Sequence, residues 1–356
     1  MTLAASSPSL NADKVRDVVD RTLEDFLTAQ EQASSLPELS LFTGVLREHL
    51  AAGGKHIRPL LCVTGWYATT EQPPLPAVYR AAASLELFHT FALIHDDIMD
   101  NSASRRGHPT AQRALAALHT DRYDAESLGI NAAILLGDLA LGWSYDLLRI
   151  TDAGADPLIR AWPLLNTMRV ETLVGQYLDL VTTRPPVTDP DLPWRAIRYK
   201  TAKYTVERPL QIGAVLAGAR PGQLRALSAY ALPLGEAFQL RDDLLGVFGT
   251  PEQTGKSVLD DLREGKHTVL VATALARATA EQEQVLRTHL GVRGLTPADA
   301  AAVRQVLKDT GARAAVEQMI AERHRRALDA LDQAPLRPSA REVLRQQALS
   351  LTERAL

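Results

Sequence analysis

The sequence predicts an all-α protein. Apolar residues recur at helical spacing from residue 11 onwards. No convincing run shows the alternation of β-branched residues that is typical of strands. The chain is rich in Ala and Leu, whereas aromatic residues make up only 5% of it, a composition that suits packed helices. Its 356 residues suffice for two average domains or one large one, and we expect a single helical domain over residues 1–356.

Glycine, proline and polar clusters divide the chain into helices. These breakers fall at 53–54, 73–76, 101–110, 119–129, 182–194 and 249–256. Residues 182–194 could link two domains, but informative residues lie on both sides of them. We therefore expect a surface loop at 182–194 within one domain, and flexible residues at 1–10.

Composition excludes several classes of protein. A net charge of −3, with 39 basic and 42 acidic residues, gives no sign of a nucleic-acid surface. The one cysteine, Cys62, lies in an apolar run and is expected to be a buried small side chain. The N-terminus lacks a basic start followed by an apolar stretch, and no run approaches the roughly 18 apolar residues of a membrane span. We expect a cytoplasmic protein without a membrane span.

Two acidic clusters carry the strongest chemical signal. In HDDIMD at 95–100, Asp96 and Asp100 are four residues apart and share one face of a helix. Burying such like charges costs several kcal/mol unless a cation lies between them, and oxygen-only ligands favour Mg²⁺. A second cluster, QLRDD, contains Asp242 and Asp243. Together the clusters indicate Mg²⁺-bound phosphate chemistry.

Basic residues accompany both clusters. Arg105 and Arg106 follow the first, where they could simply pair with its aspartates or could hold a phosphate. GGKHIRP at 53–59 is a weak anion-site signal and is not a Walker A motif. His89, two turns before Asp96, is more often a core residue than a ligand when it stands alone. The lysines near the second cluster, taken singly, are more often solvated, but the collective pattern favours two diphosphates bridged by metal.

These residues carry a resemblance to a known family. GGKxxRP, the DDxxD helix followed by RRGxPT, GQ at 175–176, KT at 200–201, FQxxDD at 238–243 and the later GK elements occur in order. The chain resembles a head-to-tail trans-isoprenyl diphosphate synthase, of the farnesyl and geranylgeranyl diphosphate synthase type. The resemblance implies helices around a deep central cavity, and a homodimer.

The resemblance also implies the role of each site residue. Two of three Mg²⁺ ions would be held by Asp96 and Asp100, with Asp97 assisting, and the third by Asp242, with Asp243 close by. The isopentenyl diphosphate site would comprise Lys55, Arg58, His89 and Arg106. The groups around the allylic diphosphate would be Arg105, Lys200, Thr201, Gln239, Lys256 and Lys266.

Two other functions remain open at this stage. A class I terpene cyclase also combines a DDxxD helix with Mg²⁺, but it lacks an isopentenyl diphosphate site. GGKHIRP and the pair Arg105-Arg106 indicate such a site here and so favour coupling over cyclisation. A regulatory partner of an active synthase would tolerate the one departure from the family pattern, where DDLLG places Gly246 at the position of the last aspartate. We expect Asp242→Ala to abolish turnover and Gly246→Asp to change it little.

The residues before Asp96 bear on product length. Ala92, Phe91 and Phe88 lie about 6, 7.5 and 12 Å along the helix from Asp96. Ordinary core packing is the simplest role for both phenylalanines. In the family, an aromatic residue five before the motif with a small residue at four is similar to the geranylgeranyl-producing type. We expect a twenty-carbon product, with a farnesyl or longer product as the alternative.

Overall fold

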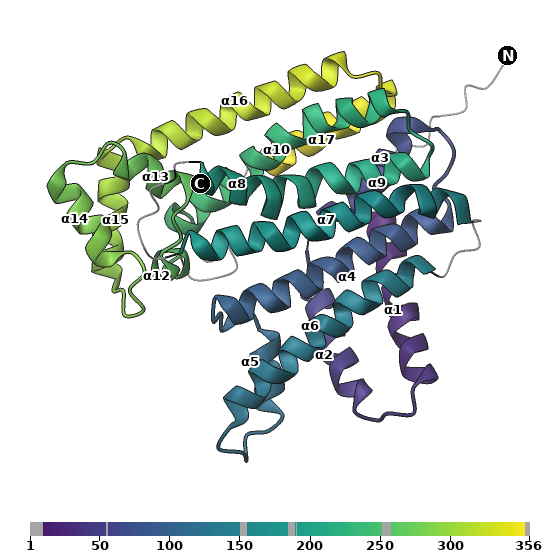
Figure 1. Ribbon diagram of the computed structural model, residues 1–356, viewed down its shortest axis with the longest axis horizontal. Coiled ribbons are helices and arrows are strands. Elements are labelled where there is room, and N and C mark those ends of the chain that lie inside the picture. Colours follow the sequence, from purple (N-terminus) through teal and green to yellow (C-terminus); the bar gives the residue numbers. More distant parts are fainter. Residues whose placement is uncertain are drawn as a thin grey trace. The chain divides into compact units, whose positions relative to one another are not determined.

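The structure is a computed structural model that describes residues 10–54, 56–149, 155–183, 189, 191–250 and 258–352. Helices dominate it (Figure 1). Among these residues, extended structure is confined to a hairpin of two-residue strands and an isolated bridge between Thr183 and Lys266. The predicted all-α class is therefore confirmed. Of the segment expected to be flexible, residues 1–9 lie outside the described part.

The chain divides into two compact units. Unit 1 comprises Met1–Ala161 and Ile212–Ala219, and unit 2 comprises Trp162–Gln211 and Arg220–Leu356. Helices α7 (Ala155–Val181) and α9 (Arg208–Leu216) each contribute residues to both units. The single domain expected from the sequence stays a prediction.

Unit 1 contains most of the N-terminal helices. Their interruptions near 53–54, 73–76 and 101–110 fall at predicted breakers, whereas the interruption at 34–38 was not predicted. Helix α6 begins inside the segment 119–129, which was expected to interrupt helical structure throughout, so that interruption is shorter than predicted. The elements are α1 (Ala12–Ala33), α2 (Leu39–Ala51), α3 (Ile57–Thr69), α4 (Pro76–Met99), β1 (Ser104–Arg105), β2 (His108–Pro109), α5 (Ala111–Ala117) and α6 (Ala125–Arg149).

Helix α4 is the centre of unit 1. It packs against α1, α3 and α6 (Figure 1), and all its residues from Ala81 to Phe88 are buried. Alanines and a serine in this stretch let the neighbouring helices approach closely from several sides. Cys62 on α3 is fully buried, as expected. A Cβ at Gly213 of α9 would overlap the carbonyl oxygen of Cys62, so the two backbones touch.

Unit 2 contains the C-terminal helices and a π-helix, η1. Helix α8 begins at Leu192, which is buried, so residues 192–194 are helical rather than part of the predicted surface loop 182–194. Apolar Leu-Pro-Trp after the acidic turn explains this start, since Pro is favoured in a first helical turn. The elements are α8 (Leu192–Ala196), η1 (Ile197–Glu207), α10 (Pro221–Phe248), α12 (Asp260–Glu264), α13 (Val269–Leu275), α14 (Ala280–His289), α15 (Pro297–Asp309), α16 (Ala312–Gln333) and α17 (Pro338–Thr352).

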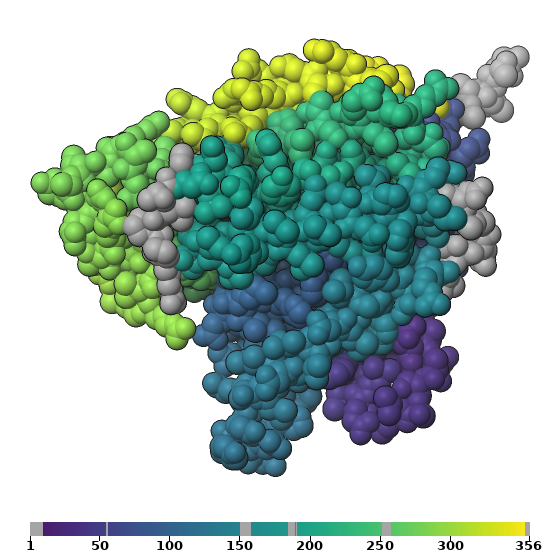
Figure 2. All heavy atoms as spheres, viewed as in Figure 1, coloured from purple at the N-terminus to yellow at the C-terminus, as the bar shows by residue number. Residues whose placement is uncertain are grey.

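Helix α10 is the centre of unit 2 and packs against η1, α16 and α17. Leu240, Leu244 and other apolar residues of α10 share one core with α13, α15 and α16. The buried Tyr230 hydroxyl donates to the carbonyl oxygen of Leu344 in α17 at 2.7 Å, which fixes the C-terminal helix on α10. Figure 2 shows α16 and α17 in yellow, and α14 and α15 in light green, on the surface of this unit.

Candidate functional site

The first acidic motif closes helix α4 in unit 1. Asp96 and Asp97 lie in its last turn, and Asp100 is the C-cap residue. The backbone N–H of Asp100 donates to the carbonyl oxygen of Asp96 at 2.8 Å, which confirms that the two aspartates are one helical turn apart. The Asp96 side chain is 18% exposed, whereas that of Asp97 is fully buried. The two neighbouring carboxylates therefore differ in their access to solvent.

The buried carboxylate of Asp97 is paired with Arg105. Nε of Arg105 donates to its two oxygens at 3.0 and 2.9 Å, and Nη2 donates at 2.7 Å. Burial raises the pKa of Asp97, and the hydrogen bonds from Arg105 counteract part of that rise. Gln112, which the sequence reasoning missed, donates from Nε2 to the backbone oxygens of Asp97 and Ser102 at 3.1 and 2.9 Å. Both oxygens of Asp97 already accept hydrogen bonds, and its assisting role at a metal stays a prediction.

A short hairpin holds the two arginines. Strands β1 and β2 pair in antiparallel fashion, and the turn between them places Arg106 and Gly107 at positive φ, 52° and 80°. Arg106 donates from Nη1 to the carbonyl oxygen of Gly53. The guanidinium packs so closely that a Cβ at Gly54 would lie 2.9 Å from its Nη1. The structure thus brings the GGKHIRP and RRG motifs together, although Lys55 itself lies outside the described residues.

Positive charges surround His89 on α4. Burial lowers its pKa well below the ordinary value, and the cations Arg58, Arg106 and Arg105 lower it further. Burial lowers the pKa of Arg106, and the negative charge of Glu86 raises it again. Glu86 is a buried residue one turn before His89 on α4, and it was not predicted from the sequence. Three of the residues predicted for the isopentenyl diphosphate site are therefore electrostatic neighbours. A neutral imidazole beside two guanidinium groups suits an anion.

The second acidic motif lies on α10 in unit 2. Asp243 accepts a hydrogen bond from Nε2 of Gln239 at 2.8 Å. Burial raises the pKa of Asp243 to about 7, and the carboxylates of Asp261, Asp242 and Asp179 contribute to the rise. Asp179 and Asp261 were not predicted, although Asp179 closely follows the GQ pair at 175–176 and Asp261 lies five residues before Lys266. The two-residue motif is thus part of a larger group of carboxylates.

The KT pair of the π-helix η1 joins this group. Lys200 donates from Nζ to Asp179 at 2.6 Å, and Thr201 donates from its hydroxyl to Oε1 of Gln239, also at 2.6 Å. Two sets of hydrogen bonds therefore start at adjacent residues of η1. Lys200 reaches Asp179 of α7, and Thr201 reaches Gln239 of α10, which in turn donates to Asp243.

Gly246 stands where the usual motif has its last aspartate, and the space beside it is occupied. A Cβ at this position would overlap Oδ2 of Asp261 and lie 2.8 Å from its Cγ. Asp261 comes from the short helix α12. Our expectation that Gly246→Asp changes little stays untested, but this contact leads us to revise it. The side chain of Asp261 would have to turn away, and two carboxylates would then lie side by side.

The GK elements are described only in part. Nζ of Lys266 lies 2.8 Å from Oε2 of Glu264, which precedes the left-handed Gly265 that ends α12. The bridge between Lys266 and Thr183 ties this turn to the residues after α7. Lys256 lies outside the described residues, and the predicted diphosphate contact of both lysines stays a prediction.

The residues predicted to set product length lie inside unit 1. Phe88 and Phe91 are 1% and 4% exposed. Their ring centroids are 5.4 Å apart, and Phe91 also meets His95 edge-on at 4.8 Å. Ala92 is only partly buried. Core packing by both phenylalanines is confirmed, and their role as the floor of a product cavity stays a prediction.

The predicted metal ligands fit a hard divalent cation. All five are aspartates, and carboxylate oxygens are the ligands that Mg²⁺ prefers. Burial and, to a smaller extent, neighbouring carboxylates raise the pKa of Asp243, and a cation beside Asp242 and Asp243 would favour its ionised form. Within the described ranges, no three His, Cys, Asp or Glu side chains already converge on one point.

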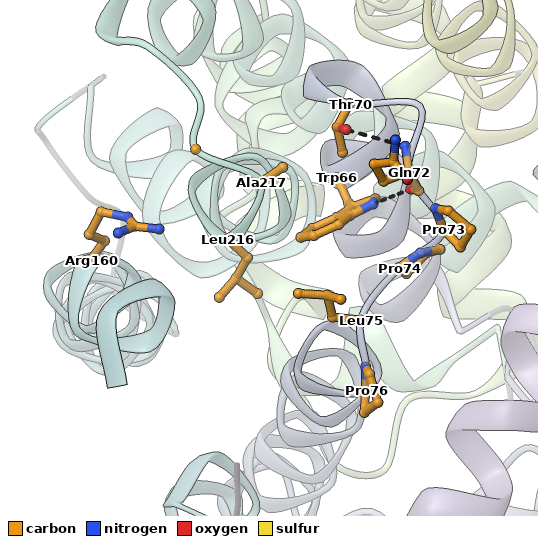
Figure 3. A pocket seen from close by; sticks show the side chains of 11 residues that line it. Trp66, Thr70, Gln72, Pro73, Pro74, Leu75, Pro76, Arg160, Leu216 and Ala217 are labelled. Carbon is orange, nitrogen blue, oxygen red and sulfur yellow. Dashed lines mark hydrogen bonds between the residues drawn. The ribbon is translucent and has the colours of Figure 1, made fainter. Parts of the chain in front are cut away.

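A pocket of about 580 Å³ lies elsewhere in unit 1, at the connection between α3 and α4. Figure 3 shows Trp66, whose Nε1 donates to the carbonyl oxygen of Gln72 at 2.7 Å. Pro73, Pro74, Leu75, Pro76 and Leu216 also line the pocket. None of the predicted site residues lines this pocket. It is therefore not the predicted reaction site.

Comparison with known proteins gives the same family as the motifs. Residues 40–310 match the profile of the family described as polyprenyl synthetase. The crystal structure of geranylgeranyl pyrophosphate synthase from Corynebacterium glutamicum, complexed with isoprenyl diphosphate and magnesium, is 40% identical. It covers 97% of this chain and 100% of its own, with a TM-score of 0.92.

Two curated relatives show that product length varies within this similarity. Geranylgeranyl diphosphate synthase of Saccharolobus solfataricus is 30% identical over 292 residues, 81% of this chain and 80% of the relative. An all-trans-nonaprenyl-diphosphate synthase of Rhodobacter capsulatus is 29% identical over 346 residues, 97% of this chain and 98% of the relative. Taken with the motifs, these matches show that the chain belongs to the polyprenyl synthetase family of trans-prenyltransferases, and that it is most like a geranylgeranyl diphosphate synthase.

Proposed function

We propose that the protein is a geranylgeranyl diphosphate synthase, which condenses isopentenyl diphosphate with allylic diphosphates to a twenty-carbon product. The observation that carries this proposal is the 40% identity, over 97% of the chain, to the Corynebacterium synthase. The Phe91–Ala92 pair before Asp96 supports the same product. Relatives of other product lengths make a farnesyl or longer product the first alternative.

We also propose that the reaction depends on three Mg²⁺ ions. Asp96 and Asp100 would hold two of them and Asp242 the third, with Asp97 and Asp243 as close neighbours. Bound Mg²⁺ supplies positive charge to the leaving diphosphate. The Corynebacterium relative was solved with magnesium and isoprenyl diphosphate, which supports this choice of metal.

The chain's own residues would then position and stabilise the substrates. Lys200 and Arg105 would contact the allylic diphosphate and stabilise the negative charge that develops on it as the allylic C–O bond breaks. Arg58, His89 and Arg106 would hold isopentenyl diphosphate, whose double bond attacks the allylic carbon. A C–C bond forms and a proton leaves for the departing diphosphate. The protein contributes orientation and exclusion of water.

One assay tests the proposed function. Labelled isopentenyl diphosphate is offered with five-, ten- and fifteen-carbon allylic diphosphates, with Mg²⁺ or with a chelator, and the products are sized. We expect a twenty-carbon product that disappears with the chelator. Shorter or longer products would reject the geranylgeranyl assignment but keep the reaction. Hydrocarbon formed from geranylgeranyl diphosphate alone would instead indicate a class I cyclase, and no turnover without a partner synthase would indicate a regulatory subunit.

We further propose a homodimer in the cytoplasm. Helix α6 exposes Ile130, Ile134 and Leu135 at 38%, 40% and 59%, and such an apolar row is uncommon on the surface of a monomer. By length and composition, α6 is also the one helix among the described residues that could span a membrane. A second copy of the chain packed against α6 would cover these exposed apolar residues without a membrane.

Light scattering coupled to size exclusion tests the dimer. Leu135→Glu is expected to reduce the measured mass from two chains to one, because a charge would be buried in the interface. Leu118→Glu, at an exposed leucine after α5, is the matched control and should leave the mass unchanged. A wild-type mass of one chain would contradict the proposal, and cell fractionation tests the location.

A further inference from the structure

The π-helix η1 carries the KT pair and is unusual in itself. It spans eleven residues, Ile197–Glu207, whereas π-helical structure normally appears as a single wide turn inside an α-helix. A helix with i→i+5 hydrogen bonds has a wider backbone than its α-helical neighbours. Something in the surrounding unit 2 must therefore hold it.

Helix α7 meets η1 along one face. Glu171, Gly175 and Asp179 are spaced four apart, so they follow one another on the same side of α7. Glu171 accepts a hydrogen bond from Lys203, and Asp179 accepts one from Lys200 at 2.6 Å. Between them, a Cβ at Gly175 would overlap the backbone nitrogen of Lys200 and lie 2.8 Å from its Cα. The glycine thus lets the α7 backbone touch the backbone of Lys200 itself.

Helix α10 meets η1 in the same way. A Cβ at Gly235 would lie 2.5 Å from Cα and 2.8 Å from Cβ of Ala202. One turn further along α10, Oε1 of Gln239 accepts a hydrogen bond from the hydroxyl of Thr201 at 2.6 Å. Both helices therefore contact η1 at a glycine. Four residues after that glycine, each helix carries a hydrogen-bond acceptor: Asp179 for Lys200 and Gln239 for Thr201.

We propose that Gly175 and Gly235 are positioning residues that hold η1 at backbone contact between α7 and α10 and so aim Lys200 and Thr201 at the allylic diphosphate. The inference rests on the proposed function, because it takes these two side chains to bind diphosphate. The closest atoms at both glycines are backbone atoms, and the one side-chain atom among them, Cβ of Ala202, cannot rotate away. A methyl group at either position must push η1 away.

The test compares Gly175→Ala and Gly235→Ala with Gly44→Ala in the full-length protein. Gly44 is a helical glycine of α2 with nothing within 4 Å of an added Cβ, which makes it the matched control. Each protein is measured for thermal midpoint, for binding of inorganic diphosphate with Mg²⁺ by calorimetry well below that midpoint, and for kinetics.

In the two positioning variants we expect diphosphate affinity to fall by about tenfold or more, because displacements near 1 Å at a site have effects of that size or larger. KM for the allylic substrate should rise while KM for isopentenyl diphosphate stays near wild type. Gly44→Ala should match wild type in every binding measurement. A lower thermal midpoint with unchanged diphosphate affinity and unchanged KM would overturn the proposal, since it would reduce both glycines to packing.

Two further variants keep the test decisive if an alanine variant fails to fold. Ala202→Gly combined with Gly235→Ala removes one of the two clashing methyl groups, so it should recover part of the lost affinity. Gln239→Leu removes the acceptor for Thr201 without adding bulk near η1, and it should weaken diphosphate binding in a folded protein. Because Gln239 also donates to Asp243, the recovery in the Ala202→Gly, Gly235→Ala pair assigns the effect to the glycine contact, and wild-type affinity in Gln239→Leu would count against the inference. Wild-type protein that neither binds diphosphate nor turns over would instead refute the proposed function.

Discussion

Single residues decide how complete the second acidic motif is. The motif ends in Gly246, and the carboxylate of Asp261 occupies the space that a side chain at 246 would take. Asp261 is also the first of the carboxylates that raise the pKa of the buried Asp243. The missing aspartate has therefore not left an apolar gap, because a carboxylate from another helix stands in its place.

Gly246→Asp is expected to harm the protein. The new Cβ would overlap Oδ2 of Asp261 and add a second negative charge beside it, and overpacking of this kind costs roughly 1–3 kcal/mol in stability. The midpoint of thermal denaturation and the turnover rate should both fall below those of the wild type. Gly246→Ala controls for bulk without charge, and Asp261→Gly in the Gly246→Asp background should restore stability. If Gly246→Asp alone were as stable and active as the wild type, the contact with Asp261 would not limit the side chain at position 246.

Asp97→Asn should destabilise the end of α4. It removes the charge to which Arg105 donates through Nε and Nη2, and hydrogen bonds to charged groups contribute about 1.5–3 kcal/mol. Chemical denaturation gives the free energy of unfolding. The control is Asp13→Asn, which breaks an ion pair whose aspartate is 83% exposed and should cost little. Equal effects from the two substitutions would show that the Asp97–Arg105 pair adds no stability.

Some of these residue-level facts could be predicted from sequence and others could not. The spacing of Asp96 and Asp100 follows from helical periodicity alone. The pairing of Asp97 with Arg105 depends on a hairpin turn with Arg106 at positive φ, an uncommon conformation for a side chain of that size. The place of Asp261 depends on how α12 packs on α10. Contacts across a turn or between helices are set by packing, for which one sequence gives no periodic signal.

Among the elements, helix α4 combines two tasks. Its last turn carries the first acidic motif, and the preceding two turns carry Phe91 and Phe88, both buried. The axis of one helix therefore places Phe91 and Phe88 about 7.5 and 12 Å from Asp96. Helical periodicity predicted this element well. It could not predict that η1 is a π-helix, since its wider winding leaves no 3.6-residue pattern to read.

Phe91→Ala is expected to lengthen the products. The substitution removes a ring that meets both Phe88 and His95, so a growing chain could extend past the position of the ring. Chromatography of the products measures the effect, at low temperature because removing a buried phenylalanine costs roughly 3–5 kcal/mol. Phe26→Ala, in the core contact between α1 and Trp143, is the matched control and should lower stability without changing length. Unchanged products from Phe91→Ala would reject its role as the floor.

For the whole molecule, the path of the chain ties the two units together. The chain leaves unit 1 after Ala161, returns to it at Ile212 and leaves it again after Ala219. Two of these crossings fall inside continuous helices, α7 and α9. Helix formation is cooperative, so melting the part of such a helix in one unit removes hydrogen bonds from its continuation in the other.

We therefore expect one cooperative unfolding transition, although chains with two compact units often show two. Tryptophans report on each unit separately, because Trp66 and Trp143 belong to unit 1 and Trp162 and Trp194 to unit 2. Variants that keep only Trp143 or only Trp194 should give the same urea midpoint by fluorescence, and far-UV circular dichroism should coincide with both. Proline at Leu210, inside α9 near the crossing, should lower the two midpoints together because it breaks a shared helix. Separate midpoints in the two reporters would show that each unit unfolds alone, in which case the continuous helices fray at the boundary without coupling the units.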